Sequence, residues 1–220
     1  QRLSKLGIKH KLFYLNVGGV NVKLINELKD NTVSKKPCTQ FVCASRFVEY
    51  KNHRLLLSIF NRLDKFNINF ELILIGNGDL YTEIKNYVST KNLSNKITFL
   101  DKKTNKDVLK YIINADYYIQ LSSEYEKKVK GGSYIHAEGM GRTFLEAICC
   151  ETYIITSKTG AIPEIISDDN GVLLDLNNKN EIISVLKNLI KNKKISKNFN
   201  NKIYSWETYF KNYDSLFNDF

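Results

Sequence analysis

Several absences limit what this chain can be. Proline occupies only 2 of 220 positions, and no segment approaches the ~20 consecutive apolar residues that a membrane-spanning helix needs. The three histidines have no metal-ligand spacing, and no two of the four cysteines have the C-x-x-C spacing of a metal or redox site. We therefore expect no bound metal. Cys149 and Cys150 lie in an apolar segment and are expected to be buried, reduced thiols, which are typical of a cytoplasmic protein.

Positive charge, by contrast, is in excess. The chain has 33 lysines and arginines against 23 aspartates and glutamates, which gives a net charge of +10, and much of the excess lies in residues 191–202. Such a charge predicts attraction to phosphates, nucleic acid or an anionic membrane face without choosing among them, and it is also typical of a solvated lysine-rich surface. Apolar residues make up 43% of the chain, which is enough for a packed core.

Short apolar runs alternate with helical patterns along the chain. We expect strands at residues 12–17, 40–44, 70–75, 96–100, 116–121, 153–156 and 172–174. Helices are expected at 52–65, 80–90, 105–114, 142–150, 180–191 and 204–217, with Asn52 capping the first of them. Strands that are apolar throughout are buried on both faces, as in a parallel sheet covered by helices. The predicted fold class is α/β, with a doubly wound, Rossmann-like parallel sheet.

Ligands of such folds lie outside the carboxyl ends of the strands, and three loops rich in polar residues follow strands there: 45–51, 76–79 and 122–141. The loop 76–79 reads Gly-Asn-Gly-Asp. A dinucleotide fingerprint needs a third glycine at position 81, where this chain has Tyr81. A tight strand-to-helix turn is therefore favoured there, and no NAD site is predicted.

The segment 138–146 (EGMGRTFLE) carries the strongest chemical signal. Its glycines let the backbone approach a ligand closely, and the start of the following helix offers free N–H groups to a phosphate. Glu146 lies one helical turn beyond Arg142 on the same face, and a carboxylate there can accept from two neighbouring ribose hydroxyls. The alternative is a capped helix with two surface acids, Glu138 and Glu146.

Arg46 and Lys51 follow the strand at 40–44, at the same predicted edge of the sheet. Arginine can grip a diphosphate through two hydrogen bonds, and lysine adds a point charge. Two solvated surface cations are the alternative for this pair. His136 lies near Glu138 in the long loop and is expected to face solvent.

These segments occur in the order found in the C-terminal domain of group 1 glycosyltransferases, the large retaining class with the GT-B architecture, and the chain resembles that domain over residues 38–217. The matching motifs are 44–52 (ASRFVEYKN), 72–78 (LILIGNG), 115–123 (ADYYIQLSS), 138–147 (EGMGRTFLEA), 160–165 (GAIPEI), 170–171 (NG) and 204–206 (YSW). The chain departs from the family at 149–153 (CCETY), where small residues and a G-x-P turn are usual, and at Asn52, where glycine is common.

The resemblance implies a role for each matching residue. Arg46 and Lys51 would bind the diphosphate of a nucleotide sugar, and residues 100–102 would meet the base. Backbone amides of the glycine-rich turn would contact the phosphates and donor sugar; these belong to Gly139, Met140, Gly141, Arg142 and Thr143. Glu138, the catalytic residue, would contact sugar hydroxyls, and Glu146 the ribose. The family transfers sugar with retention. It needs neither a metal nor a cofactor, because cations and the helix end stabilise the charge of the departing phosphate.

The resemblance also predicts the domain organisation. Residues 1–30 would be a linker or a remnant of the N-terminal acceptor-binding domain, and residues 31–220 the donor-binding domain. Without its partner domain the fragment is expected to be inactive. The acceptor would be a glycan or a lipid-linked molecule, and a lipid-linked acceptor predicts a peripheral contact of the enzyme with the inner membrane face. Residues 124–137 form a longer connection than is typical, either a mobile flap or a disordered surface insertion.

Two other functions remain open on the sequence. A sugar-nucleotide epimerase of the GT-B type would share the donor site, and its acid and base would lie in the other domain. A non-enzymatic basic module for nucleic acid or membrane would need aromatics interleaved with cations on one exposed face. The thirteen tyrosines fall mostly inside apolar patterns, which indicates a core role, and nucleic acid is not expected as a partner.

Overall fold

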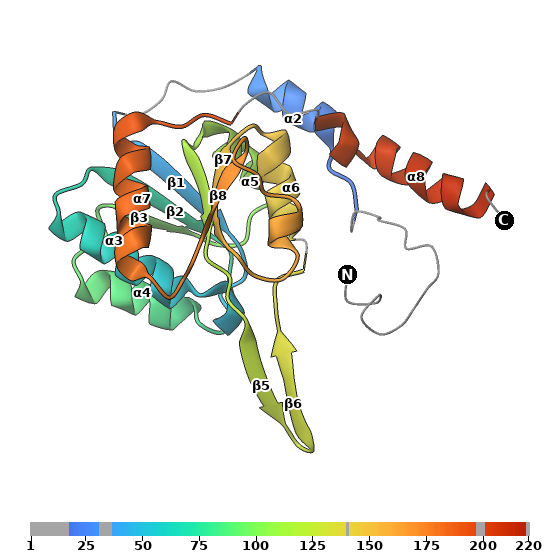
Figure 1. The fold of residues 1–220 in the computed structure, drawn as a ribbon. Coiled ribbons are helices and arrows are strands. Elements are labelled where there is room, and N and C mark those ends of the chain that lie inside the picture. The colour runs from blue at the N-terminus through green and yellow to red at the C-terminus, as the bar shows by residue number, and fades with distance from the viewer. Residues whose placement is uncertain (1–17, 31–36, 140, 197–200, 219–220) are drawn as a thin grey trace.

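The computed structural model describes residues 18–30, 37–139, 141–196 and 201–218 (Figure 1). The strand expected at 12–17 and the site residue Met140 lie outside these ranges. Within them, no helix combines the length and the apolar character needed to cross a bilayer.

A six-stranded parallel sheet forms the centre of the domain, as predicted. Its strands lie in the spatial order β3-β2-β1-β4-β7-β8, which is the 3-2-1-4-5-6 order of the doubly wound dinucleotide-binding folds. The bounds are β1 Thr39–Ala44, β2 Phe70–Ile75, β3 Ile97–Leu100, β4 Tyr117–Gln120, β7 Tyr153–Ser157 and β8 Gly171–Leu174. Because β1 pairs with both β2 and β4, the chain reverses its winding direction beside β1, where such folds bind their ligands.

Helices cover both faces of the sheet and bury two apolar clusters (Figure 1). One face packs against α3 (His53–Lys65), α4 (Tyr81–Thr90) and α7 (Lys179–Asn192). The other packs against α2 (Val22–Lys29), α5 (Asn105–Asn114) and α6 (Arg142–Cys149), together with the short helix η2 (Ile162–Glu164). The continuous apolar runs of β1, β4 and β7 are explained by this double burial.

Three local features differ from the sequence-based expectations. Helix α2 was not predicted, and its Ile25 is fully buried in the second cluster. Asn52 does precede α3, but its side chain makes no capping hydrogen bond; its backbone is left-handed, with φ 54°, after a single 3-10 turn, η1 (Glu49–Lys51). Residues 124–137, expected to be either a mobile flap or a disordered insertion, contain a β-hairpin of β5 (Tyr125–Val129) and β6 (Gly132–His136), which projects from the sheet (Figure 1). The disordered insertion is therefore wrong, and the flap stays a prediction.

The C-terminal segment turns away from the sheet. After the short helix η3 (Asn201–Tyr204), α8 (Trp206–Asn218) extends from the body of the domain and exposes Trp206, Phe210 and Tyr213 (Figure 1). It is anchored by a parallel bridge between Val20 and Ser205. The prediction that residues 1–30 form a linker or a remnant of another domain stays a prediction.

The hairpin should be dispensable for stability, because every residue of β5 and β6 is exposed. Tyr125 and His136 lie directly opposite each other, so residues 126–135 can be replaced by an Asn-Gly turn. We expect the midpoint of thermal unfolding, followed by circular dichroism, to change by less than about 3 °C, which corresponds to roughly 1 kcal/mol for a chain of this size. A fall of ~10 °C would show that the hairpin supports the core.

Candidate functional site

A cavity of about 470 Å³ opens where β1, β2 and β3 end and where α5 and α6 begin. Among the described residues, its walls carry three cations, Arg46, Lys102 and Lys103, and a single acid, Glu146. The remaining lining residues are Ala44, Ser45, Ile75, Gly76, Asn77, Asn105, Val108 and Thr143. A concave site with this excess of positive charge is suited to an anionic ligand.

The first wall consists of two loops that touch through their glycines. A side chain at Gly76 would overlap the carbonyl of Ser45, and one at Gly78 would come within 2.6 Å of the Phe47 oxygen. The amide of Phe47 donates to the carbonyl of Asn77 at 3.0 Å. The Gly-Asn-Gly turn therefore serves close packing against loop 45–48, in agreement with the turn predicted there in place of a dinucleotide fingerprint.

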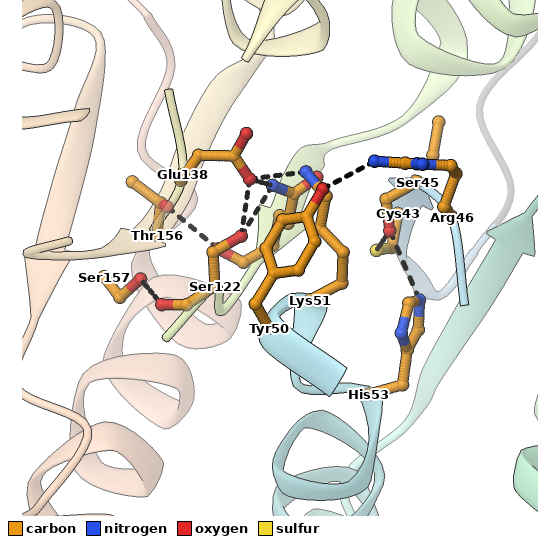
Figure 2. A network of polar contacts seen from close by, with 12 residues as sticks. Cys43, Ser45, Arg46, Tyr50, Lys51, His53, Ser122, Glu138, Thr156 and Ser157 are labelled. Carbon is orange, nitrogen blue, oxygen red and sulfur yellow. Dashed lines mark hydrogen bonds and ion pairs between the residues drawn. The ribbon is translucent and has the colours of Figure 1, made fainter. Parts of the chain in front are cut away.

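A buried polar chain supports the Ser45 end of this wall (Figure 2). Ser45 Oγ lies 3.3 Å from His53 Nε2 and 3.7 Å from Cys43 Sγ. The His53 ring stacks on Phe47 with centroids 4.2 Å apart. Burial, with a smaller contribution from Lys51, lowers the pKa of His53 to about 4, and burial raises the pKa of Cys43 to about 11. Both groups are thus neutral near pH 7 and act as packing for the loop.

The second wall is the start of α6. Gly141 precedes the helix with φ 59°, and a side chain there would collide with the Phe144 ring. The first amides of a helix have no acceptor within the helix, and their dipoles favour a negative charge. Thr143 and Glu146 face the cavity from this helix.

Glu146 is held in place from α5. Its Oε1 accepts from Asn105 Nδ2 at 2.9 Å. Burial raises the pKa of the Glu146 carboxyl above its ordinary value of 4.5, while Asn105 and Arg142 act in the opposite direction. A carboxylate kept at the end of a cavity despite this cost is a good candidate for binding ligand hydroxyls.

Glu138 is also buried, and the protein itself binds one of its two oxygens (Figure 2). Glu138 Oε2 accepts from Ser122 Oγ at 2.9 Å and from Gln120 Nε2 at 3.0 Å. The same oxygen forms a short ion pair with Lys51 Nζ, whose side chain is only 11% exposed. Oε1 points towards the Gly141 turn, which would bring it towards a ligand bound at the start of α6.

Further hydrogen bonds hold Gln120 and Ser122, the two neutral partners of Glu138, in place. The hydroxyl of Tyr118 donates to Gln120 Oε1 at 3.0 Å, and Thr156 Oγ1 donates to the Gln120 carbonyl at 2.8 Å. Ser157 Oγ donates to the carbonyl of Ser122. Because every member comes from the ends of β4 and β7, the sheet itself sets the position of the Glu138 carboxylate.

Tyr50 contacts both Arg46 of the cavity wall and Lys51 of the Glu138 network. Arg46 Nη2 donates to the Tyr50 hydroxyl at 2.8 Å, and Lys51 Nζ lies 5.2 Å from the centre of the Tyr50 ring (Figure 2). Arg46 lines the cavity, whereas Lys51 lies in the Glu138 network and is absent from the cavity wall. An ammonium has three N–H donors, so Lys51 retains donors beyond the one used by Glu138.

Of the predicted site residues, Arg46, Thr143 and Glu146 line the cavity, and Glu138 and Lys51 meet in the adjacent network. Gly139, Gly141 and Arg142 form the turn into α6 without lining the cavity, and Met140 lies outside the described residues. The sequence reasoning missed Asn77, Lys103 and Asn105 and gave Lys102 only a backbone role. Their position just after β2 and β3 was the available signal.

The six-stranded parallel sheet with helices on both faces matches solved structures of GT-B glycosyltransferases. The sucrose-phosphate synthase of Thermosynechococcus elongatus superposes with a TM-score of 0.74 at 17% identity, covering 99% of this chain and 55% of that one. Anabaena HepE, in a complex with UDP and glucose, superposes with a TM-score of 0.70 at 16% identity, covering 92% of this chain and 55% of that one. At these identities the likeness concerns the fold.

Residues 25–206 match the family model described as glycosyl transferases group 1, and the chain belongs to this family. An uncharacterised glycosyltransferase of Methanocaldococcus jannaschii is 29% identical over 148 residues, which are 64% of this chain and 38% of that protein. An N-acetylgalactosaminyltransferase of Campylobacter jejuni, whose name gives a diphospho-undecaprenol-linked substrate, is 25% identical over 154 residues, or 69% of this chain and 37% of that protein. The matched region thus spans less than half of these relatives.

Gly160 should be essential for the position of Glu138. Its φ is 58°, and a side chain there would overlap the Glu138 carbonyl, so Gly160→Ala is expected to lower the free energy of unfolding in urea by roughly 1–3 kcal/mol. Gly139→Ala is the matched control, since nothing lies within 4 Å of the added atom. Equal effects of the two substitutions would contradict the assigned role of Gly160.

The raised pKa of Glu146 predicts a pH-dependent cost. A carboxyl whose folded pKa is raised destabilises the fold as the pH rises above its unfolded value, here about 4.5, and has no such effect below it. Glu146→Gln should therefore raise the melting temperature at pH 7, and the increase should disappear at pH 4. Glu83 has a lowered pKa through its hydrogen bond to Arg54, so Glu83→Gln should give no increase. A pH-independent effect of Glu146→Gln would contradict the burial argument.

Proposed function

We propose that this chain is the donor-binding domain of a retaining glycosyltransferase, and that it binds a nucleotide-diphosphate sugar in the cavity at the ends of β1, β2 and β3. The observation that carries the proposal is the composition of that wall: Arg46, Lys102 and Lys103 surround the space, and Glu146 is the one acid among the described residues that line it. A nucleotide diphosphate presents the complementary pair of features, namely an anionic diphosphate and a ribose with two neighbouring hydroxyls.

The lining residues suggest an orientation for the ligand. The base would lie against residues 100–103, and the ribose hydroxyls would donate to Glu146, which Asn105 holds in place. The diphosphate would then meet Arg46 and the first amides of α6, including those of Gly141, Arg142 and Thr143. The UDP bound by Anabaena HepE, a structural neighbour, supports a nucleotide ligand for this fold.

The donor sugar would follow the diphosphate towards Gly139 and Glu138. Glu138 would accept from sugar hydroxyls through Oε1 while Oε2 stays bound to Ser122, Gln120 and Lys51. Lys51 neutralises this carboxylate, and its remaining N–H donors would reach the departing phosphate. Charge developing on that phosphate would be stabilised by cations and by the dipole of α6, so we propose that the reaction needs neither a metal nor a cofactor.

The acceptor site is assigned to a part of the enzyme outside this domain. The matched region covers only 37–38% of the two relatives compared, which leaves room for an N-terminal acceptor-binding domain. We propose a glycan or lipid-linked acceptor, in line with the lipid diphosphate in the name of the Campylobacter relative, and a cytoplasmic location. On this proposal the isolated chain binds the donor without transferring its sugar.

Titration calorimetry with UDP, GDP and ADP tests the donor site directly. At least one should bind, with EDTA present throughout, and Arg46→Gln should weaken that binding by roughly 10–100-fold, because it removes charge-assisted hydrogen bonds. Binding of the corresponding nucleoside should not change, since it has no phosphate. Arg54→Gln is the control, because Arg54 pairs with Glu49 and Glu83 away from the cavity.

The ribose assignment has its own test. Glu146→Ala should weaken binding of the ribonucleotide and have little effect on its 2′,3′-dideoxy analogue, which lacks the hydroxyls. Failure of the unaltered chain to bind any of the three nucleotides would refute the proposed function. Product analysis on the longer enzyme, by NMR of the anomeric linkage, then separates transfer with retention from epimerisation of the donor.

A further inference from the structure

The β5–β6 hairpin carries a surface that the donor site does not use. It projects beyond the domain (Figure 1), and every residue of both strands is exposed. A single two-stranded hairpin is only marginally stable in water, and exposed apolar side chains on it add to that cost. Such a ribbon gains stability when a partner covers its exposed apolar side chains.

Charge is divided along the hairpin. Its distal part, residues 127–135, contains Lys127, Lys128 and Lys130 and no acid. The single acid of the two strands, Glu126, lies nearer the root, where its Oε1 accepts from Ser133. The tip of the hairpin is therefore uniformly positive.

Apolar groups accompany these lysines. Val129 is 49% exposed, Tyr134 44% and Ile135 64%. Lys127 and Tyr134 lie directly opposite each other, so they share one face with Val129, while Lys128 and Ile135 lie on the other. Both faces of the distal part thus combine a lysine with an apolar or phenolic side chain.

The root of the hairpin belongs to the donor site. The His136 ring lies 4.6 Å from the Tyr50 ring, and the Tyr50 hydroxyl accepts from Arg46 in the cavity wall. Five residues per strand extend about 17 Å from that root. Whatever binds the tip is consequently held at a fixed, short distance from the cavity.

We propose that the distal part of the hairpin, residues 127–135, docks on the anionic headgroups of a phospholipid bilayer. Lysines can keep their ammonium groups among lipid phosphates while their stems, Val129, Tyr134 and Ile135 contact the upper acyl region. The unpaired strand edges keep the hairpin out of the hydrocarbon, so it rests in the headgroup layer. Nucleic acid is the less suitable anion, because residues 125–136 contain no arginine to pair with phosphates or to stack on bases.

Vesicle sedimentation with the chain as it stands tests this surface. At about 0.1 M salt the chain should bind vesicles of 70% phosphatidylcholine and 30% phosphatidylglycerol, and it should bind pure phosphatidylcholine vesicles weakly. Each lysine near an anionic surface strengthens the partition about fivefold. The triple variant Lys127→Gln, Lys128→Gln, Lys130→Gln should therefore lose about a hundredfold, and Val129→Ser with Tyr134→Ser should weaken binding further without changing the charge.

The matched control removes three exposed lysines from other elements: Lys85→Gln, Lys91→Gln, Lys179→Gln. It has the same net charge as the hairpin triple variant and should retain vesicle binding. No binding to the anionic vesicles, or equal losses in the two triple variants, would overturn the proposal in favour of a general charge effect. Hairpin-dependent binding to a short DNA duplex without vesicle binding would overturn it in favour of nucleic acid.

Nucleotide calorimetry on the same variants separates this proposal from the donor assignment. The hairpin variants should bind the nucleotide as the unaltered chain does, because their side chains lie outside the cavity wall. Vesicle binding lost with nucleotide binding intact concerns the hairpin alone, and absence of nucleotide binding with vesicle binding intact concerns the donor site alone.

Discussion

The buried ion pair between Lys51 and Glu138 is the interaction on which the site depends. Removing two charges from water is expensive, and each group here is tolerable only because the other compensates it. The pair joins the loop after β1 to the segment that leads into α6, two parts of the chain 87 residues apart. Arg46, Tyr50 and the Gly141 turn take their positions from these two segments. The geometry of the cavity is therefore coupled to an electrostatic contact beside it.

At the second carboxylate, the proposed ligand-binding role would act against the stability of the fold. Glu146 lies in the wall of a cavity where burial favours its neutral form, and a single amide from Asn105 offsets part of that cost. An apolar residue would suit the fold better. The three cations of the same wall make the arrangement intelligible, because a ligand that brings hydroxyls to Glu146 and phosphates to the cations would satisfy both sets of groups at once.

The parallel sheet was predictable because its strands are mostly apolar, and burial on both faces explains runs such as 41–44 and 72–75. The glycine-rich turn before α6 could also be predicted from the sequence. Helix α2 was missed because it is short and has a single fully buried residue, Ile25, too little for a periodic signal. The hairpin was missed because both its faces are exposed, so β5 and β6 lack the apolar alternation that marks a half-buried strand.

The contacts between side chains of the site, by contrast, could not be predicted from the sequence. Lys51 and Arg46 look equivalent in sequence, yet one is buried against Glu138 and the other lines the cavity. Gln120 and Ser122 belong to the apparently apolar run 116–121 and its end, where nothing in the pattern distinguishes a hydrogen-bond donor from a core residue. Such pairings depend on which strand ends become neighbours in space, and the strand order β1-β4-β7 brings them together.

The contact of Gly160 with the Glu138 backbone couples the segment after β7 to the carboxylate proposed to bind the donor sugar. The segment after β7 abuts the carbonyl of Glu138, and the amide of Ala161 donates to that carbonyl at 3.4 Å. Any redesign of sugar preference that alters Glu138 must accordingly treat residues 158–161 as part of the same unit. A scaffold that received only residues 138–146 would contain the Glu138 carboxylate but not residues 158–161, which contact its backbone.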